Sequence, residues 1–176
     1  GPPGALRMKR LLIVWHSRTG AARQMAEAAA RGAAAAAALL EQPDELAVTL
    51  RRAADAGVDE VLASDGLLFC APENLASLSG EMKEFFDRCY YGALDRIAGR
   101  PYACLVSAGS DGAGAARQVE RICTGWRLRA VAPPLIVNLG AQTPQQIAAP
   151  KTVAPAELAR CEEAGGLLAG LLLAAG

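Results

Sequence analysis

The sequence predicts an α/β domain in which one parallel sheet lies between two layers of helices. Strand-like and helix-like segments alternate five times along the 176 residues, a pattern typical of parallel sheets whose right-handed crossovers place helices on both faces. Most of the strand-like segments are continuous apolar runs, which indicate strands that are buried on both faces. A chain of this length fits a single domain. We therefore expect a three-layer sandwich around a five-stranded parallel sheet.

The first half of the chain contributes three of the expected strands and two helices. Two of these strands are short apolar runs, and the other shows a weaker alternation of apolar and polar residues. A long alanine-rich stretch follows the first strand, and alanine has the highest helix propensity of all residues. The expected strands are residues 9–15, 45–52 and 66–71, the last closed by Pro72, and the expected helices are residues 21–40 and 58–64.

The second half begins with an amphipathic helix after Ser79, because apolar residues recur there at helical spacing. Its apolar stripe consists of Met82, Phe85, Phe86, Cys89 and Tyr90. Two further apolar runs predict the fourth and fifth strands, each followed by a loop and a helix. The strands are residues 102–107 and 135–139, the loops 108–114 and 140–155, and the last helix 156–173; the helix between them has a stripe of Val119, Ile122, Cys123 and Trp126.

Composition argues against several classes of function. Lysine plus arginine equal aspartate plus glutamate at 18 each, so no long-range field attracts nucleic acid or an anionic membrane. The apolar C-terminal stretch is shorter than the ~20 residues needed to cross a bilayer, and no signal peptide is visible. Five cysteines without a CxxC pair indicate buried, reduced thiols and a cytoplasmic protein. We expect residues 1–7 to be a cloning remnant or a disordered N-terminus and residues 8–176 to form one domain.

The loop that leaves the first strand has the composition of a phosphate site. In open parallel sheets, ligands bind outside the carboxyl ends of the strands, and a helix that starts there directs its free amides and positive dipole end toward an anion. Glycine lets the backbone come close, and hydroxyl and guanidinium groups add donors. The alternative is that Ser17 or Thr19 merely caps the helix. The candidate phosphate-binding residues are Ser17, Arg18, Thr19, Gly20, Ala21 and Ala22.

Two further polar loops follow the third and fourth strands and reach the same edge of the sheet. Together they are suited to flank a flat ring, with backbone groups contacting its polar edge and Leu75 covering one face. Taken singly, each also fits an ordinary surface loop. The candidate residues of these loops are Pro72, Glu73, Asn74 and Leu75 after the third strand, and Ser107, Ala108, Gly109, Ser110 and Gly112 after the fourth.

These motifs resemble the flavodoxin and NAD(P)H-dependent FMN reductase superfamily over nearly the whole chain. The resemblance rests on residues 12–20, 71–74 and 79–88 and on the glycine-rich turn after Ser107. It implies a flavodoxin-like fold in which the first loop holds the phosphate of flavin mononucleotide (FMN) and the other two contact the isoalloxazine ring. It further implies NAD(P)H as electron donor, a small-molecule acceptor such as a quinone or a flavin, and a homodimer or homotetramer. No side chain is assigned a catalytic role, because the flavin carries the chemistry.

The chain departs from the family pattern at two places. Ala22 stands where the family has a hydroxyl residue, and no aromatic residue follows Pro72 to stack on the ring. Tyr90 and Tyr91 are distant candidates for such stacking, although helix packing is the simpler explanation for both. These departures leave open a flavodoxin-type electron carrier or a flavin-free interaction module. Electron carriers of this family tend to be acidic, so the balanced charge of this chain disfavours the first alternative.

His16 is the only histidine of the chain. A single histidine excludes a histidine-rich metal site and makes a serine, histidine and aspartate triad hard to assemble. Its place beside the phosphate loop leaves two interpretations, a strand-end histidine bonded to the backbone or a contact to the ligand.

Overall fold

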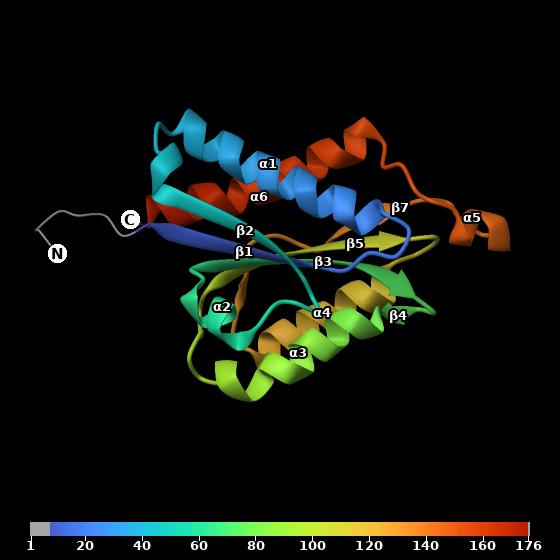
Figure 1. Cartoon of the computed structure of the whole chain (residues 1–176), viewed down its shortest axis with the longest axis horizontal. Helices are drawn as coiled ribbons and strands as arrows, with labels where there is room; N and C mark the ends of the chain where they lie inside the picture. Colours follow the sequence, from blue (N-terminus) through green and yellow to red (C-terminus); the bar gives the residue numbers. More distant parts are fainter. Residues whose placement is uncertain (1–7, 176) are drawn as a thin grey trace, which may run out of the picture.

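A parallel sheet separates two helical layers, as Figure 1 shows for residues 8–175, the part of the chain that this computed structural model describes. The strands are β1 (Lys9–Trp15), β2 (Leu46–Arg52), β3 (Gly66–Asn74), β4 (Ser77–Leu78), β5 (Pro101–Ala108), β6 (Arg129–Ala130) and β7 (Leu135–Asn138). The helices are α1 (Ala21–Leu39), α2 (Val58–Ala63), α3 (Gly80–Ala93), α4 (Ala113–Gly125), α5 (Pro144–Ala148) and α6 (Pro155–Ala174), with a 3-10 turn at Pro43–Glu45. Residues 1–7, for which we expected a cloning remnant or a disordered N-terminus, lie outside the described residues.

The strand order across the sheet is β2-β1-β3-β5, and β6 and β7 share the next position, where both pair with β5. All of these pairs are parallel. The chain builds the sheet outward from β1 first on one side and then on the other, so the strand order reverses between β1 and β3. This topology confirms the expected flavodoxin-like three-layer sandwich.

The two faces of the sheet bury different kinds of side chain. The face under α1 and α6 packs alanine and leucine, and the face under α2, α3 and α4 packs an aromatic cluster. In that cluster the ring of Phe69 lies 4.8 Å from the ring of Phe86, and Trp126 meets both rings edge-on. All five cysteines are buried and unpaired, which confirms their expected role as small core residues.

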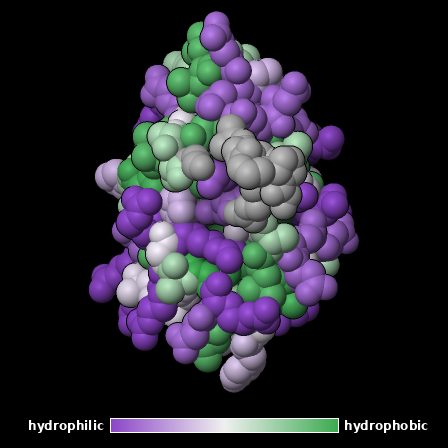
Figure 2. All heavy atoms as spheres, turned by 90° about the vertical axis from the view of Figure 1, so that its left-hand side faces the viewer, coloured by the Kyte–Doolittle hydropathy of each residue, from purple (hydrophilic) through white to green (hydrophobic). Residues whose placement is uncertain are grey.

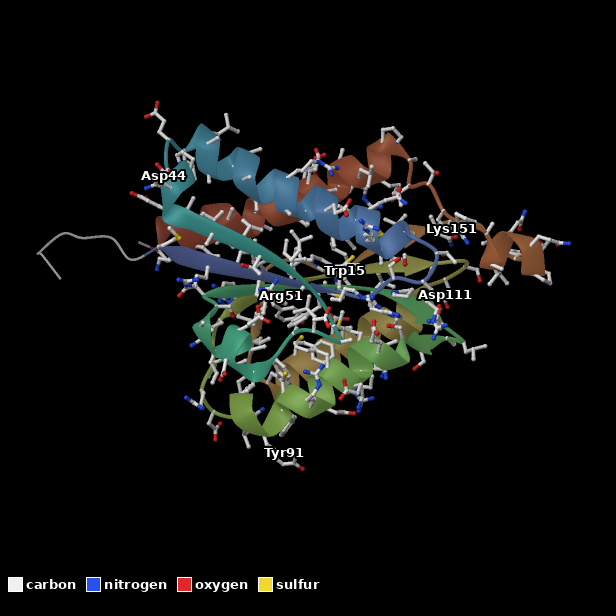
Figure 3. The ribbon with its side chains drawn as sticks, in the orientation of Figure 1. Trp15, Asp44, Arg51, Tyr91, Asp111 and Lys151 are labelled. Carbon is white, nitrogen blue, oxygen red and sulfur yellow. The ribbon has the colours of Figure 1, made fainter. Side chains whose placement is uncertain are left out.

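The predicted apolar stripe of α3 is buried at four of its five positions. Tyr90 is the exception, because its side chain is 38% exposed at the edge of the buried face. Tyr91 points away from the core and is 85% exposed, so packing against the core does not account for this tyrosine. Figure 3 places Tyr91 at the outer surface of α3, far from the carboxyl ends of the strands.

Two short strands, one short helix and the 3-10 turn were not predicted from the sequence, and the expected end of the third strand is wrong. Pro72 does not close the third strand, which continues through it to Asn74 and turns back into β4. β1 pairs with β3 only as far as Cys70, so no β1 residue lies opposite Pro72 and its missing N–H leaves no β1 carbonyl without a donor. The two-residue strands β4 and β6 and the five-residue α5 are too short to leave a periodic pattern, although Thr143 and Gln146 form a capping box at the start of α5.

Figure 2 shows the end of the molecule at which the strands begin, where polar and apolar side chains are intermixed around the residues drawn in grey. The arrows of β3 and β5 in Figure 1 point to the opposite end. No helix among residues 8–175 has the length and apolar character needed to cross a bilayer.

The backbones of α1 and α6 approach each other closely at Gly165. A Cβ atom on Gly165 would lie 1.9 Å from the Ala29 carbonyl oxygen, whereas one on Gly170 of the same helix would meet no atom within 4 Å. Gly165→Ala should therefore lower the free energy of unfolding by about 1–3 kcal/mol. Gly170→Ala, the matched control, should raise it by up to about 1 kcal/mol through helix propensity. Urea unfolding measures both, and equal stability of the two variants would contradict the close helix contact.

Candidate functional site

A cavity of about 290 Å³ opens at the carboxyl ends of β1, β3 and β5, between the three loops that leave these strands. This volume is close to the lower end of the range typical of ligand sites, about 300–1,000 Å³. Ten of the fifteen residues predicted from the sequence line it: Ser17, Arg18, Thr19, Ala21, Ala22, Pro72, Glu73, Asn74, Ser107 and Gly109. The strand register brings these loops together, because Trp15 lies beside Cys70 and Pro72 lies beside Ser107.

The other five predicted residues lie next to the cavity but do not line it. Gly20 and Gly112 directly precede α1 and α4, and Ala108 is buried at the end of β5. Ser110 is exposed in the turn that follows. Leu75 sits at the tip of the turn between β3 and β4 with its side chain fully in solvent, 101% exposed, so it covers no face of the cavity.

A fourth wall of the cavity was not foreseen from the sequence. It comes from the segment after β7 and consists of Leu139, Ala141, Ile147, Ala148 and Lys151. Backbone hydrogen bonds hold this wall in place: the Lys151 amide donates to the Thr19 carbonyl (2.8 Å) and the Ala141 amide donates to the Gly109 carbonyl (2.9 Å). The available signal was topological, because a loop after a fifth parallel strand must leave the sheet at the same edge.

Gln24 in α1 connects the fourth wall of the cavity to the first loop through hydrogen bonds. Its Nε2 donates to the carbonyl oxygens of Gly20 (3.0 Å) and Lys151 (2.8 Å), and its Oε1 accepts from the Val153 amide (2.9 Å). One amide side chain thus joins the start of α1 to a segment almost 130 residues further along the chain. The cavity is therefore shaped before any ligand enters.

The start of α1 leaves backbone donors open beside the cavity. Gly20 has the left-handed conformation (φ 102°), and its amide donates to Ser17 Oγ (3.0 Å). Gln24 is the first helix residue whose amide reaches a backbone carbonyl, that of Gly20. Within the described residues, the amides of Ala21, Ala22 and Arg23 have no acceptor, as expected for a first turn without a side-chain cap. Ser17 thus stabilises the turn but does not cap the helix.

Positive charge accompanies these open amides. Arg18 and Lys151 line the cavity, and neither forms an ion pair with any carboxylate in the described part of the chain. The Lys151 ammonium donates to the carbonyl oxygens of Ile147 (2.9 Å) and Ala149 (2.6 Å), which holds it beside α5. Open amides at a helix start together with two unpaired cations fit a doubly charged phosphate group.

His16 lies behind the first loop and does not line the cavity. Its Nδ1 is 2.8 Å from Ser79 Oγ, so the ring bonds to a side chain, while the backbone amide of His16 donates to the Cys70 carbonyl. Its Nε2 is 3.2 Å from Glu81 Oε2, a contact without hydrogen-bond geometry. Burial lowers the pKa of His16, which Glu81 partly opposes and Arg18 and Arg52 reinforce. The imidazole is therefore neutral at pH 7.

No aromatic side chain lines the cavity among the described residues. In Figure 3, Lys151 and Asp111 lie at the end of the molecule that holds the cavity, and Tyr91 lies far from both. Tyr91 instead packs edge-on against Tyr90, with 5.4 Å between their ring centres. Neither tyrosine therefore takes the place of the ring-stacking residue within one chain.

Comparisons with known proteins identify relatives of this chain. A sequence model of the NADPH-dependent FMN reductase family matches residues 8–143. A flavodoxin of Aquifex aeolicus is 33% identical over 107 residues, which cover 61% of this chain and 54% of the relative. An NAD(P)H dehydrogenase (quinone) of Acidithiobacillus ferrooxidans is 32% identical over 94 residues, which cover 46% of this chain and 47% of the relative. The chain thus spans about half the length of the curated relatives it matches.

The fold is shared with solved flavodoxin structures. The structure of a flavodoxin from the domain Archaea superimposes with a TM-score of 0.73 at 16% identity, covering 93% of this chain and 99% of the other. The family model spans more than half of the sequence, from β1 to the loop after β7. On this match, the chain belongs to the NADPH-dependent FMN reductase family.

Proposed function

We propose that the protein is an oxidoreductase that binds FMN in this cavity and passes electrons from NAD(P)H to a small acceptor such as a quinone or a flavin. The observation that carries the proposal is the start of α1, where the amides of residues 21–23 have no acceptor among the described residues and Ala21, Ala22, Arg18 and Lys151 line the cavity. Family membership and the printed name of the quinone dehydrogenase relative support the reaction class. The buried, unpaired thiols suit a reducing compartment, so we place this activity in the cytoplasm.

Each part of the chain has a separate task in this proposal. The amides of residues 21–23 bind the phosphate, with Arg18 and Lys151 balancing its charge. The loops at residues 72–74 and 107–109 supply backbone groups for the polar edge of the ring. The aliphatic side chains of Leu139 and Ile147 give the cavity an apolar side. Bound FMN supplies the hydride and electron transfer, so the chain needs no acid, base or nucleophile of its own.

An electron carrier is the second candidate, because one relative is named a flavodoxin. The net charge of zero gives this chain no field to steer it toward a basic protein partner. The two functions differ in how bound flavin reacts with a nicotinamide cofactor. A carrier is reduced by a partner protein and reacts slowly with NAD(P)H.

The purified chain should bind FMN more tightly than riboflavin by at least about tenfold, because only FMN carries the phosphate that the start of α1 is built to accept. Fluorescence quenching of the two flavins measures the ratio. Anaerobic NADPH should then bleach the bound flavin within seconds. Equal affinities for the two flavins would contradict the phosphate site, and a flavin that stays yellow with NADPH would favour the carrier.

Lys151→Met should weaken FMN binding by about tenfold, since it removes a charged partner of the phosphate. Riboflavin affinity should stay unchanged, which separates loss of charge from collapse of the fourth wall. Lys83→Met removes a lysine of α3 that pairs with Asp87 on the surface and should leave both affinities unchanged. If Lys151→Met lowered the affinities for FMN and riboflavin equally, the Lys151 ammonium would not contact the phosphate.

Gly20→Val should abolish FMN binding because the backbone at residue 20 must keep a positive φ, which a β-branched residue strongly resists. Crowding is not the cause, since a Cβ there would meet no atom closer than 3.5 Å. Gly99 also has a positive φ (82°) with open space around it, but it precedes β5 and so lies at the opposite end of that strand from the cavity. Gly99→Val is therefore a matched control, with a similar loss of stability but normal FMN affinity. FMN binding that survives Gly20→Val would refute this placement of the phosphate.

A further inference from the structure

Two helices start beside the cavity with nearly the same backbone. Gly20 precedes α1 with φ 102° and ψ −13°, and Gly112 precedes α4 with φ 97° and ψ −11°. Both helices follow parallel strands, and neither has an acidic residue in its first turn. Each is longer than three turns, so each directs free amides and a positive dipole end toward its N-terminus. Judged by backbone conformation alone, the N-termini of α1 and α4 are equally suited to an anion.

The start of α4 is already filled by carboxylates of the chain itself. Glu73 reaches it from β3 and accepts through Oε1 from the Gly112 amide (3.0 Å) and through Oε2 from the Ala115 amide (3.0 Å). Asp111 Oδ1 accepts from the Ala113 amide between them (3.1 Å). The corresponding amides of α1 belong to Gly20, Ala21 and Arg23, and only the first of these has a partner, the neutral hydroxyl of Ser17.

The β3–β4 hairpin holds the Glu73 carboxylate in this place. Gln118 of α4 accepts from the Leu78 amide (2.7 Å) and from Ser77 Oγ (2.9 Å), which ties the hairpin to the helix. The hairpin also lies directly against Gly114, because a Cβ on that residue would come within 2.1 Å of the Ala76 carbonyl oxygen. Position 73 therefore projects onto the first turn of α4 by construction of the fold.

Glu73 also lines the cavity. The cavity thus has a negative group that covers one helix start, and it is also lined by Arg18 and Lys151, which form no ion pair within the described residues. An incoming phosphate would meet occupied amides and charge repulsion at α4, whereas at α1 it would find open amides and attraction.

From this contrast we infer that Glu73 is a specificity-determining residue that sets the direction in which the ligand enters the cavity. Its carboxylate acts as an internal anion that satisfies the start of α4, so the phosphate binds at α1 and the flat ring is left for the loops at residues 72–74 and 107–109. The inference rests on the proposed function in taking FMN as the ligand. Glu73 acts by excluding the wrong orientation and has no part in electron transfer.

The test follows backbone amide signals by NMR while inorganic phosphate is added to the flavin-free full chain. In the unchanged protein, phosphate should shift the amides of residues 20–23 and leave those of Gly112 and Ala115 unmoved. Glu73→Ala should add a second, saturable set of shifts at Gly112 and Ala115. Glu73→Gln keeps one acceptor but loses the charge, so it should show the second set at higher phosphate concentration.

Glu120→Gln removes a carboxylate from the exposed side of the same helix, two turns from its start, and should behave like the unchanged protein. If Glu73→Ala fails to fold in a thermal melt, Glu73→Gln alone decides the outcome. If the amide signals of Gly112 and Ala115 do not shift in either folded variant, at phosphate concentrations that saturate the shifts of residues 20–23, that result would overturn the inference. So would shifts at 112 and 115 in the unchanged protein. Failure of FMN to bind is a separate result that refutes the proposed function and leaves these phosphate readouts intact.

Discussion

Parallel pairing of β3 with β1 on one side and with β5 on the other is the interaction on which the site depends. Cys70 lies beside Trp15, and Ser107 lies beside Pro72, so the three strands end at nearly the same level of the sheet. Their loops consequently leave the sheet side by side, and the reversal of strand order between β1 and β3 opens the space between them. A one-residue change in this register would reverse the faces of the strand and move every loop residue away from its neighbours.

The distribution of charge around the cavity matters more than the charge of the whole chain. The chain is neutral overall, yet Arg18 and Lys151 stand unpaired on one part of the cavity and Glu73 is bound to helix amides on another. Opposite charges at different parts of a small cavity create a local electric field inside it, although the neutral chain has no long-range field. This arrangement supports the proposed binding of a small ligand with one anionic end.

The cavity has aliphatic lining residues and no aromatic one among the described residues, in line with the departure from the family pattern after Pro72. Leu75, the residue expected to cover a ring face, points into solvent, while Leu139 and Ile147 line the cavity from the segment after β7. Hydrogen bonds of Gln24 and the Lys151 amide fix that segment to the first loop. The wall therefore depends on contacts that α1 makes with the C-terminal part of the chain.

The sequence by itself determined the order of the main strands and helices, the parallel sheet and the three loops at its carboxyl edge. These features arise from local patterns, such as the apolar run at residues 9–15 and the alanine-rich stretch of α1, which act over a few neighbouring residues. Only the tertiary structure decided that Glu73 fills the start of α4, that Leu75 faces solvent and that Lys151 joins the cavity. Those outcomes depend on hydrogen bonds between residues 39 to 129 positions apart, whose partners are chosen by how the layers pack and leave no periodic trace along the chain.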